Sequence, residues 1–543
     1  MTPLRVVVVG HGMVGSRFVD ELLARAPGAT VAVTVLGAEE YEPYNRVLLS
    51  DVVAGRTDVA SLTLPARPSG AVVRPGVTAV ALDRAGRRVL ADDGATYPYD
   101  VVVLATGARA NVPRMAGLRT GQAAGLPAGV HALRTLDDAR EIVAAAANAR
   151  RAVVLGGGVL GLEAACGLAG RGLAVTVLHG GPHVMDRQLD GDAAAATGVA
   201  LARLGVDVRT DAAATGVAHD GRRLRGVRLG STGTGGELIP ADLLVLTAGT
   251  VPETALASSA GLAVRRGVVV GDDLATADPA VFAIGDCAEP PEGGTGLVAQ
   301  GWEQARRLAA ALGGSAAVGP PDPAAGQRGD VADAEGDRAP SHPAGPPAGG
   351  PNDVVKLKAQ GVDVSAMGPR DVPAGARVVR LSDPAAGRHV EVVVHAGRVV
   401  GATCVGDPGV AADLVAAYTR ATPVPRDPAH LLLRPVRRAD TAAEPSPTLM
   451  PDRATVCRCN GVTKGDVVAQ WRAGARSTAE VVAATRATTG CGGCADAVCG
   501  LVEWLARADP PAADAHPTGA TPAGRDPVVA DAVVTPAVAP AVT

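Results

Sequence analysis

The sequence predicts an α/β protein in which two nested, doubly wound folds are followed by a small α+β domain and a small helical domain. Three observations support this fold class. The apolar run Val6–Val9 leads directly into the glycine pattern Gly10–Gly15 (GHGMVG), and the same order of strand and glycines returns at Ala152–Gly161. Five of the eight cysteines lie between Cys457 and Cys499. Two similar layered folds and a separate cysteine-rich unit are therefore expected.

The first glycine pattern predicts a strand that turns sharply into a helix. Gly10 suits the tight turn, Gly12 lets a pyrophosphate approach the backbone, and Gly15 lets the helix pack on the strand. The N-terminus of that helix offers unpaired N–H groups to phosphates. A second strand, Thr30–Leu36, ends just before Glu39, where an acid binds a ribose hydroxyl. The first fold is therefore expected to be Rossmann-like and to bind a dinucleotide.

The second glycine pattern repeats the first, with Gly156, Gly158 and Gly161 in the same three roles. A buried strand is expected at Tyr99–Ala108, where the small residues Ala105, Thr106 and Gly107 let the backbone pass close to a cofactor or another strand. Ala241–Gly249 (ADLLVLTAG) echoes that strand. A second dinucleotide fold inserted within the first would bring two cofactors face to face.

The second fold has no obvious ribose acid. Its strand Ala174–Leu178 ends in His179, with Asp186 and Arg187 further on. The missing acid weakens the case for strict NADH preference, because an acid that binds the 2'-hydroxyl also repels a 2'-phosphate. We expect His179 to be an exposed loop residue, and the choice between NADH and NADPH stays open.

Two further segments are expected to border the first cofactor. Tyr44–Ser50 is too irregular for a strand and is placed to cover the first glycine turn. Asp286 ends the strand-like run that begins at Val281, just before a helix expected near Gly296, so it could accept a hydrogen bond from a sugar-alcohol chain; a turn aspartate is the alternative. No cysteine precedes Cys166, so dithiol chemistry beside the first site is not expected.

The cysteine cluster supplies four thiolates in two close pairs, Cys457 with Cys459 and Cys491 with Cys494. Either structural zinc or an iron–sulfur cluster would fit four cysteines. We favour the cluster, because zinc sites prefer wider spacings than C-x-C. Capping boxes predict helices that start at Thr463–Asp466 and Ser477–Glu480, and a third helix is expected at Ala495–Trp504. The remaining cysteines are expected to be buried apolar residues: Cys166, Cys287, Cys404 and Cys499.

Composition excludes several classes of protein. The net charge of −4 gives no argument for nucleic acid or an anionic membrane as a partner. No apolar run approaches the roughly 20 residues of a membrane span, and a strand that starts near Arg5 leaves no room for a signal peptide. A cytoplasmic protein is therefore expected. The length of 543 residues allows three or four domains, and a homodimer is one option for the assembly.

Taken together, these motifs resemble the flavin-binding part of NAD(P)H nitrite reductase large subunits, followed by a bacterioferritin-associated ferredoxin-like (BFD-like) domain that holds a 2Fe-2S cluster. The resemblance covers about residues 4–310 and 353–506. It is carried by the glycine patterns and by YNRVLLS (Tyr44–Ser50), MDRQLD (Met185–Asp190), AIGDC (Ala283–Cys287), LVAQGWEQA (Leu297–Ala305), VKLKAQGVDVSAMG (Val355–Gly368) and CNGVTKGD (Cys459–Asp466).

The resemblance implies roles for individual residues. It implies FAD in the first site, with Glu39 on the adenosine ribose and Asp286 on the ribityl chain, and the nicotinamide in the second. It implies no catalytic acid or base. The implied binding residues are Gly10, Gly12, Gly15, Glu39, Arg46, Thr106, Gly107 and Asp286 for FAD, Gly156, Gly158 and Gly161 for NAD(P)H, and Cys457, Cys459, Cys491 and Cys494 for the cluster.

The resemblance also implies a division into domains. FAD-binding residues are expected in 1–115 and 240–312 and NAD(P)H-binding residues in 116–239. A disordered linker at 313–352 is rich in proline, glycine and alanine. The remaining expected parts are the α+β domain at 353–440, the BFD-like 2Fe-2S domain at 452–507 and a disordered tail at 508–543.

The expected function is an NAD(P)H-dependent FAD oxidoreductase that passes electrons through a 2Fe-2S cluster to a nitrate or nitrite reductase protein. Full-length nitrite reductase large subunits continue into a sirohaem domain that needs further cysteine pairs, and only Cys499 follows Cys494. We therefore expect a separate electron-transfer subunit that serves an assimilatory reductase. The alternatives are a ferredoxin or rubredoxin reductase that serves an oxygenase and a redox-sensing interaction protein.

Overall fold

The computed structural model describes most of the chain. The described residues are 2–26, 30–65, 70–118, 125–221, 223–230, 236–315, 353–433, 447–457, 460–490 and 492–509. Helix α7 continues to Ser315, three residues into the segment expected to be a linker. The rest of that segment, the tail beyond Asp509, and Cys459 and Cys491 lie outside the described residues.

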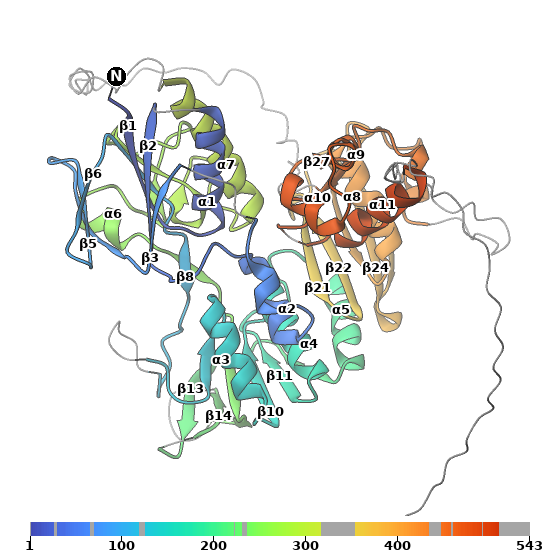
Figure 1. Ribbon diagram of the computed structural model, residues 1–543. Helices are drawn as coiled ribbons and strands as arrows, with labels where there is room; N and C mark the ends of the chain where they lie inside the picture. Colours follow the sequence, from blue (N-terminus) through green and yellow to red (C-terminus); the bar gives the residue numbers. More distant parts are fainter. Residues whose placement is uncertain are drawn as a thin grey trace, which may run out of the picture.

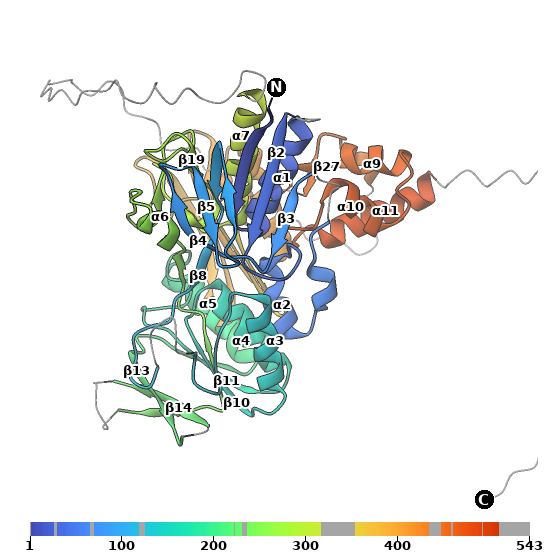
Figure 2. The same cartoon turned by 60° about the vertical axis from the view of Figure 1, so that its left-hand side comes forward.

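The first fold is built on a five-stranded parallel sheet in the order β19-β7-β1-β2-β3. Its elements are β1 (Leu4–Val9), α1 (Met13–Arg25), β2 (Val31–Gly37), β3 (Val72–Pro75), β4 (Ala79–Asp83), β5 (Arg88–Ala91), β6 (Thr96–Pro98), β7 (Val101–Leu104), α6 (Ala255–Ser259), β18 (Val268–Val269), β19 (Val281–Ala283), β20 (Ala288–Glu289) and α7 (Val298–Ser315). Helices α1 and α7 lie side by side on one face, and β4–β6 with α6 lie at the other (Figures 1 and 2). Because both faces are covered, residues Val6–Val9 of the central strand β1 form a continuous buried apolar run.

The second fold repeats this design with a parallel sheet in the order β12-β11-β10-β16-β9. Its elements are β9 (Val130–Ala132), α3 (Leu136–Ala146), β10 (Arg151–Leu155), α4 (Val159–Gly170), β11 (Ala174–Leu178), α5 (Gly191–Arg203), β12 (Val206–Arg209), β13 (Ala214–His219), β14 (Leu224–Leu229), β15 (Leu238–Pro240) and β16 (Leu243–Leu246). Alternate residues of β10 face opposite sides. Ala152 and Val154 pack against the helices, whereas Val153 and Leu155 pack against β13–β15.

The second sheet is inserted into the first at one crossing point. Strands β8 (Ala108–Ala110) and β17 (Thr250–Pro252) pair antiparallel and carry the chain out of the first fold and back. The strand expected at Tyr99–Ala108 ends earlier, at Leu104, because the backbone turns at Gly107, where φ is +71°. The nested arrangement of the two α/β folds is therefore present in the structure.

The third unit is an antiparallel sheet, in the order β21-β22-β25-β24-β23, with one helix on it. Its elements are β21 (Val355–Ala359), β22 (Val362–Met367), β23 (Arg377–Asp383), β24 (Arg388–His395), β25 (Arg398–Val405) and α8 (Pro408–Thr419). The β21–β22 hairpin shares a core with α4 and α5 of the second fold. Helix α2 (Leu49–Ala54) also packs on α4. Since the hairpin and α2 both cover α4, that helix is buried on most sides.

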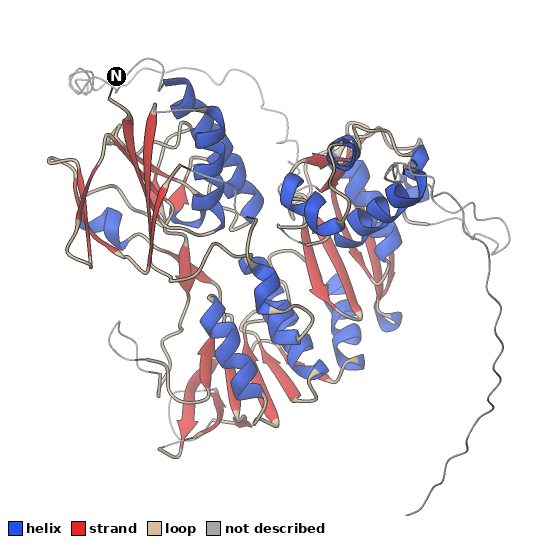
Figure 3. Ribbon diagram, viewed as in Figure 1, coloured by secondary structure: helices blue, strands red, loops and turns tan. Residues whose placement is uncertain are grey.

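The C-terminal unit is a small helical one, with a short hairpin of β26 (Thr455–Cys457) and β27 (Val462–Thr463) and the helices α9 (Lys464–Arg472), α10 (Thr478–Thr485) and α11 (Ala495–Ala508). Figure 3 shows these helices grouped at one end of the molecule. The two predicted capping boxes are present, with Thr463 and Asp466 at α9 and Ser477 and Glu480 at α10. Among the described helices, no segment combines the length and hydropathy that a membrane span requires.

Candidate functional site

The first glycine turn joins β1 to α1, and its three glycines differ in what they require. Gly10 has φ +113°, and a Cβ there would lie 2.2 Å from the carbonyl oxygen of Ala105. A Cβ on Gly15 would lie 2.1 Å from the carbonyl oxygen of Gly10. A Cβ on Gly12 would meet no atom closer than Arg46 Nε, at 4.0 Å. The protein leaves space beside Gly12, which suits the approach of a phosphate to the N-terminus of α1.

The second glycine turn, between β10 and α4, repeats this geometry. Gly156 has φ +122°, and its Cβ would lie 2.5 Å from the carbonyl oxygen of Thr247. A Cβ on Gly161 would lie 1.8 Å from the carbonyl oxygen of Gly156, whereas a Cβ on Gly158 would meet nothing within 4 Å. In each turn, two glycines are therefore required by the close backbone contacts. The middle glycine of each pattern, Gly12 or Gly158, has open space where a Cβ would stand.

A cavity of about 1120 Å³ connects the units of the molecule, and we call it the shared cavity. It runs from the first glycine turn to Val159 and Leu160, which directly follow the second turn. It also reaches Cys457 and Cys494 of the C-terminal unit. Of the predicted FAD residues, all except Gly15 line it: Gly10, Gly12, Glu39, Arg46, Thr106, Gly107 and Asp286.

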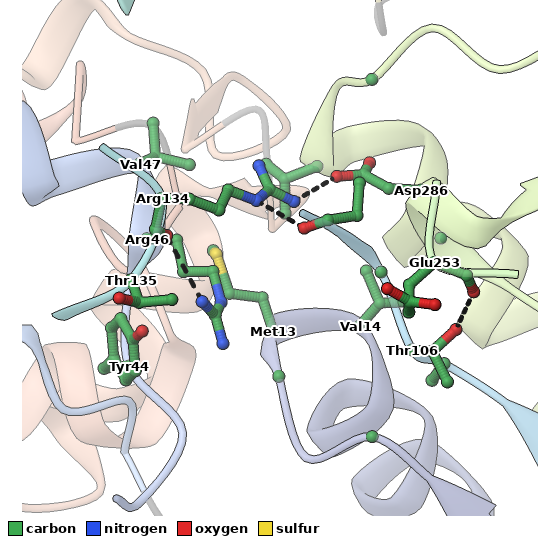
Figure 4. A pocket seen from close by; sticks show the side chains of 18 of the residues that line it. Met13, Val14, Tyr44, Arg46, Val47, Thr106, Arg134, Thr135, Glu253 and Asp286 are labelled. Atoms are coloured by element: carbon green, nitrogen blue, oxygen red, sulfur yellow. Dashed lines mark hydrogen bonds and ion pairs between the residues drawn. The ribbon is translucent and has the colours of Figure 1, made fainter. Parts of the chain in front are cut away.

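Two arginines bring positive charge into the shared cavity (Figure 4). Arg46 pairs with Glu39 and donates to the carbonyl oxygen of Arg134 at 3.4 Å. Arg134 Nη2 donates to Asp286 Oδ2 at 2.8 Å, and its Nε donates to the carbonyl oxygen of Ala108 at 2.8 Å. Guanidinium groups beside a helix N-terminus suit a pyrophosphate. The sequence reasoning missed Arg134, which is 152 residues from its partner Asp286.

Glu39 and Thr106 are held in the cavity wall by neighbouring groups. Glu39 Oε2 accepts a hydrogen bond from Tyr44 Oη at 2.7 Å. Burial of Tyr44, together with this contact, raises the pKa of its hydroxyl. Thr106 Oγ1 donates to the carbonyl oxygen of Glu253 at 2.7 Å, and Gly107 has open space where a Cβ would stand. These contacts orient the side chains of Glu39 and Thr106 in the cavity wall.

A carboxylate–ammonium pair that the sequence reasoning missed also lines the cavity. Glu163 of α4 is 3% exposed, and its Oε2 accepts from Ser50 Oγ at 2.6 Å. Lys358 of β21 donates its backbone N–H to Glu163 Oε1 at 2.9 Å, and its Nζ lies 3.9 Å from Oε2. Burial raises the pKa of Glu163, and the Lys358 charge opposes that shift. The third unit thus contributes a cation to a site formed by the other two.

His179 is not the exposed loop residue that we expected. Its side chain is 15% exposed, and its Nδ1 accepts a hydrogen bond from the Gly157 N–H at 3.2 Å. Its Nε2 lies 3.5 Å from Asp186 Oδ2. The ring faces inward because it accepts the hydrogen bond from Gly157 in the second glycine turn. The position of His179 in the sequence does not reveal this contact.

Two of the four predicted cluster ligands, Cys457 and Cys494, lie within the described residues and close together. The Cys494 thiol hydrogen-bonds to Cys457 and lowers the pKa of the Cys457 thiol. Both side chains are largely buried, and Gly492 and Gly493 lie beside them at the cavity. Paired thiols of which one ionises easily are suited to bind iron or zinc.

Three of the remaining cysteines are buried as expected, Cys166, Cys287 and Cys404, but Cys499 is exposed. The expectation for Cys499 was wrong because α11 turns its apolar face inward through Val498, Leu501, Val502 and Leu505. Cys499 lies beside that face rather than on it.

Comparisons with known proteins agree with this geometry. A family model described as "Pyridine nucleotide-disulphide oxidoreductase" matches residues 4–307, and one described as "BFD-like [2Fe-2S] binding domain" matches residues 455–504. The crystal structure of the covalent putidaredoxin reductase–putidaredoxin complex aligns with a TM-score of 0.63 and 26% identity, over 79% of this chain and 96% of that chain.

Two curated relatives align along nearly the whole chain. The NAD(P)H nitrite reductase large subunit of Klebsiella oxytoca is 33% identical over 513 residues, which are 93% of this chain and 49% of that protein. The assimilatory nitrate reductase electron transfer subunit of Bacillus subtilis is 28% identical over 516 residues, 94% of this chain and 61% of that protein. The chain therefore spans about half the length of the curated relatives it matches.

These matches confirm the expected fold class, in which two Rossmann-like folds precede a small [2Fe-2S] domain. They also confirm the expected cofactors, which are FAD, NAD(P)H and a [2Fe-2S] cluster. The chain belongs to the pyridine nucleotide-disulphide oxidoreductase family and carries a BFD-like [2Fe-2S] binding domain.

Proposed function

We propose that the protein takes electrons from NAD(P)H through FAD and passes them through its cluster to a nitrate or nitrite reductase protein. The observation that carries this proposal is the shared cavity, which is lined by both the first glycine turn and the described cluster cysteines, Cys457 and Cys494. The entry and the exit for electrons would then lie within one chain. Two curated relatives of this chain support this choice of acceptor, because one is named as a nitrite reductase large subunit and the other as a nitrate reductase electron transfer subunit.

The residues present fit each cofactor. The open space beside Gly12 and the charges of Arg46 and Arg134 suit the FAD pyrophosphate. The thiols of Cys457 and Cys494 suit iron. When bound, FAD accepts a hydride and the cluster carries single electrons, so one NAD(P)H yields NAD(P)⁺, one proton and two electrons for the acceptor.

We assign the remaining roles from the sequence and the cavity together. Glu39, Thr106, Gly107 and Asp286 orient the FAD, and Gly10 and Gly15 keep the first turn in shape. We propose the same division for the second turn, where Gly158 admits NAD(P)H and Gly156 and Gly161 support the backbone. Cys459 and Cys491 complete the cluster ligands. The FAD, NAD(P)H, α+β and cluster domains follow the boundaries given from the sequence, except that the return crossing lies at β17, so Leu243–Leu246 are assigned to the NAD(P)H domain.

Electron exit through a cysteine pair in the flavin-binding fold receives no support. The flavin-binding fold contains one cysteine, Cys287, which is buried, and the sequence has no cysteine before Cys166, which lies in α4 of the second fold. Cys166 is buried, and that burial raises the pKa of its thiol to about 11, so it is protonated and poorly reactive at neutral pH. The cluster is therefore the electron exit that we propose.

The protein's own contribution is positioning and charge, with no acid or base assigned to the reaction. Apolar side chains such as Val14, Val47 and Val159 line the cavity and limit water, which favours hydride transfer over loss of the hydride to a proton. Lys358 and Glu163 place an ammonium group and a carboxyl group side by side in the wall of the shared cavity. The cytoplasmic location stays a prediction.

The test is an anaerobic titration with NADH or NADPH, followed by separate addition of purified nitrite reductase, nitrate reductase and ferredoxin acceptors. The proposal predicts flavin and cluster absorption bands that bleach with reduced nicotinamide and recover when a nitrate or nitrite reductase protein is added. Recovery only with a ferredoxin or rubredoxin would favour the reductase that serves an oxygenase. Stoichiometric zinc with no iron would favour the redox-sensing protein.

A further inference from the structure

The segment Tyr44–Arg46 faces two sites at once. Tyr44 and Arg46 line the shared cavity and both contact Glu39. Asn45, between them, does not line the cavity. Its side chain points to the C-terminal unit, where Nδ2 donates to the carbonyl oxygens of Thr489 at 2.8 Å and Gly490 at 2.6 Å. These carbonyls belong to the two residues that directly precede the predicted ligand Cys491.

Asn45 is built into this contact. It is 2% exposed, and its Oδ1 accepts a hydrogen bond from the Val47 N–H at 3.0 Å, so the amide orientation is fixed within its own segment. Both amide hydrogens are then directed at the cysteine loop. A buried amide that satisfies two carbonyls of another unit ties the two units together, because leaving those carbonyls without a donor is unfavourable.

Helix α1 holds the same loops from a second side. Arg17 Nη1 donates to Asn460 Oδ1 at 3.1 Å, and Asn460 Nδ2 contacts Cys457 Sγ at 3.7 Å. Asp20 forms an ion pair with Arg486, and both side chains are mostly buried, at 13% and 9% exposure. Asn460, which follows Cys457, and residues 486–490, which precede Cys491, are therefore both held to the first fold.

We propose that Asn45 is a positioning residue. It holds the backbone of Thr489 and Gly490, next to the predicted ligand Cys491, against the flavin-binding fold and so sets the rate of electron transfer from flavin to cluster. This inference rests on the proposed function. With FAD and the cluster bound, single electrons would pass from one to the other with no atom exchanged. Asn45 does not line the shared cavity, and it acts through the backbone at Thr489 and Gly490.

Asn45→Asp separates this role from local support. Aspartate keeps an oxygen that can accept from the Val47 N–H, but it lacks the amide donors and places a negative charge opposite two carbonyl oxygens. The matched control is Asn111→Asp. Asn111 Nδ2 also donates to a distant backbone carbonyl, that of Ala248 at 3.0 Å, but it lies away from the cysteine loops. Asn45→Ser, which keeps a capping oxygen, replaces Asn45→Asp if the aspartate variant does not fold.

Two measurements on the full-length protein test the proposal. Hydrogen exchange of the 486–490 amides, measured without any nicotinamide, is expected to accelerate about tenfold in Asn45→Asp and to stay unchanged in Asn111→Asp. In anaerobic stopped flow with NAD(P)H, flavin bleaching is expected to keep its wild-type rate, while cluster bleaching slows about tenfold.

These outcomes distinguish a failure of the positioning role of Asn45 from a failure of the proposed function. Unchanged exchange and unchanged cluster bleaching in the Asn45 variant overturn the positioning role alone. Equal slowing of flavin and cluster bleaching also overturns it, because the residue would then act on the flavin site. Failure of the wild-type cluster to accept electrons from the flavin overturns the proposed function itself.

Discussion

The two open glycines, Gly12 and Gly158, allow the cofactor sites to be tested one at a time. In Gly12→Val the new side chain enters the space that we assign to the FAD pyrophosphate. In Gly158→Val it enters the equivalent space at the second turn. Both residues have φ values that any amino acid adopts, −86° and −79°, so the backbone is not strained by either change.

The expected magnitudes follow from the contacts. A Cβ on Gly12 lies 4.0 Å from its nearest atom, so we expect the free energy of unfolding of the apoprotein to fall by only about 1 kcal/mol, the effect of a poor helix cap. Overpacking against a ligand costs roughly 1–3 kcal/mol or more. FAD affinity should therefore fall by about tenfold to a hundredfold or beyond. Gly10→Val should lose the fold, because φ is +113° and its Cβ would lie 2.2 Å from a carbonyl oxygen.

The assay is fluorescence titration of the apoprotein with FAD, followed by reduction with NAD(P)H. Gly12→Val should bind FAD poorly, and Gly158→Val should stay yellow but be reduced slowly by NAD(P)H. The thermal unfolding temperature of each variant serves as the folding control. Wild-type FAD affinity in a folded Gly12→Val protein would refute the assignment of the first turn.

Three further changes probe other parts of the site. Cys491→Ser should remove the cluster absorption bands and the bound iron but keep NAD(P)H-to-dye activity; bands that persist would mean that Cys491 is no ligand. Arg134→Met should weaken FAD binding about tenfold or more in the same titration, because Asp286 would then face the cavity without its guanidinium partner; unchanged affinity would exclude a role in binding. Lys358→Met should lower the free energy of unfolding by about 3 kcal/mol at neutral pH, because it leaves the buried Glu163 carboxylate without its nearby cation. The pKa of Glu163 is raised, so this loss should grow as the pH rises through that pKa and shrink in acid, where Glu163 is neutral and only the hydrogen bond from Lys358 Nζ to the carbonyl oxygen of Val47 is lost. Urea unfolding across pH checks the sign, and a loss that is independent of pH would contradict it.

Much of the fold could be predicted because its determinants are local. In the first glycine turn, a Cβ on Gly15 would meet the carbonyl oxygen of Gly10 in the same turn. A short sequence pattern can therefore reveal the need for glycine there. The capping boxes at Thr463 and Ser477 join residues three positions apart. Such signals are visible in one sequence and survive in the tertiary structure.

The parts that escaped prediction depend on contacts between distant segments. Asn45 bonds to a residue 445 positions away, and Lys358 bonds to one 195 positions away. Both residues lie in motifs that carry the family resemblance, but neither motif reveals the distant partner. Cys499 was misplaced because one residue along a helix turns a side chain by about 100°, enough to move it off the apolar face. His179 was misplaced because its partner is the second glycine turn, 22 residues earlier.

The central claim is that flavin and cluster exchange electrons within one molecule, through the shared cavity. The most direct test is anaerobic stopped flow with NAD(P)H at several protein concentrations, following the flavin and cluster bands separately. The account predicts that flavin bleaching precedes cluster bleaching and that the rate constant of cluster bleaching does not change with protein concentration. A rate that rises in proportion to protein concentration would mean transfer between molecules and would contradict the account.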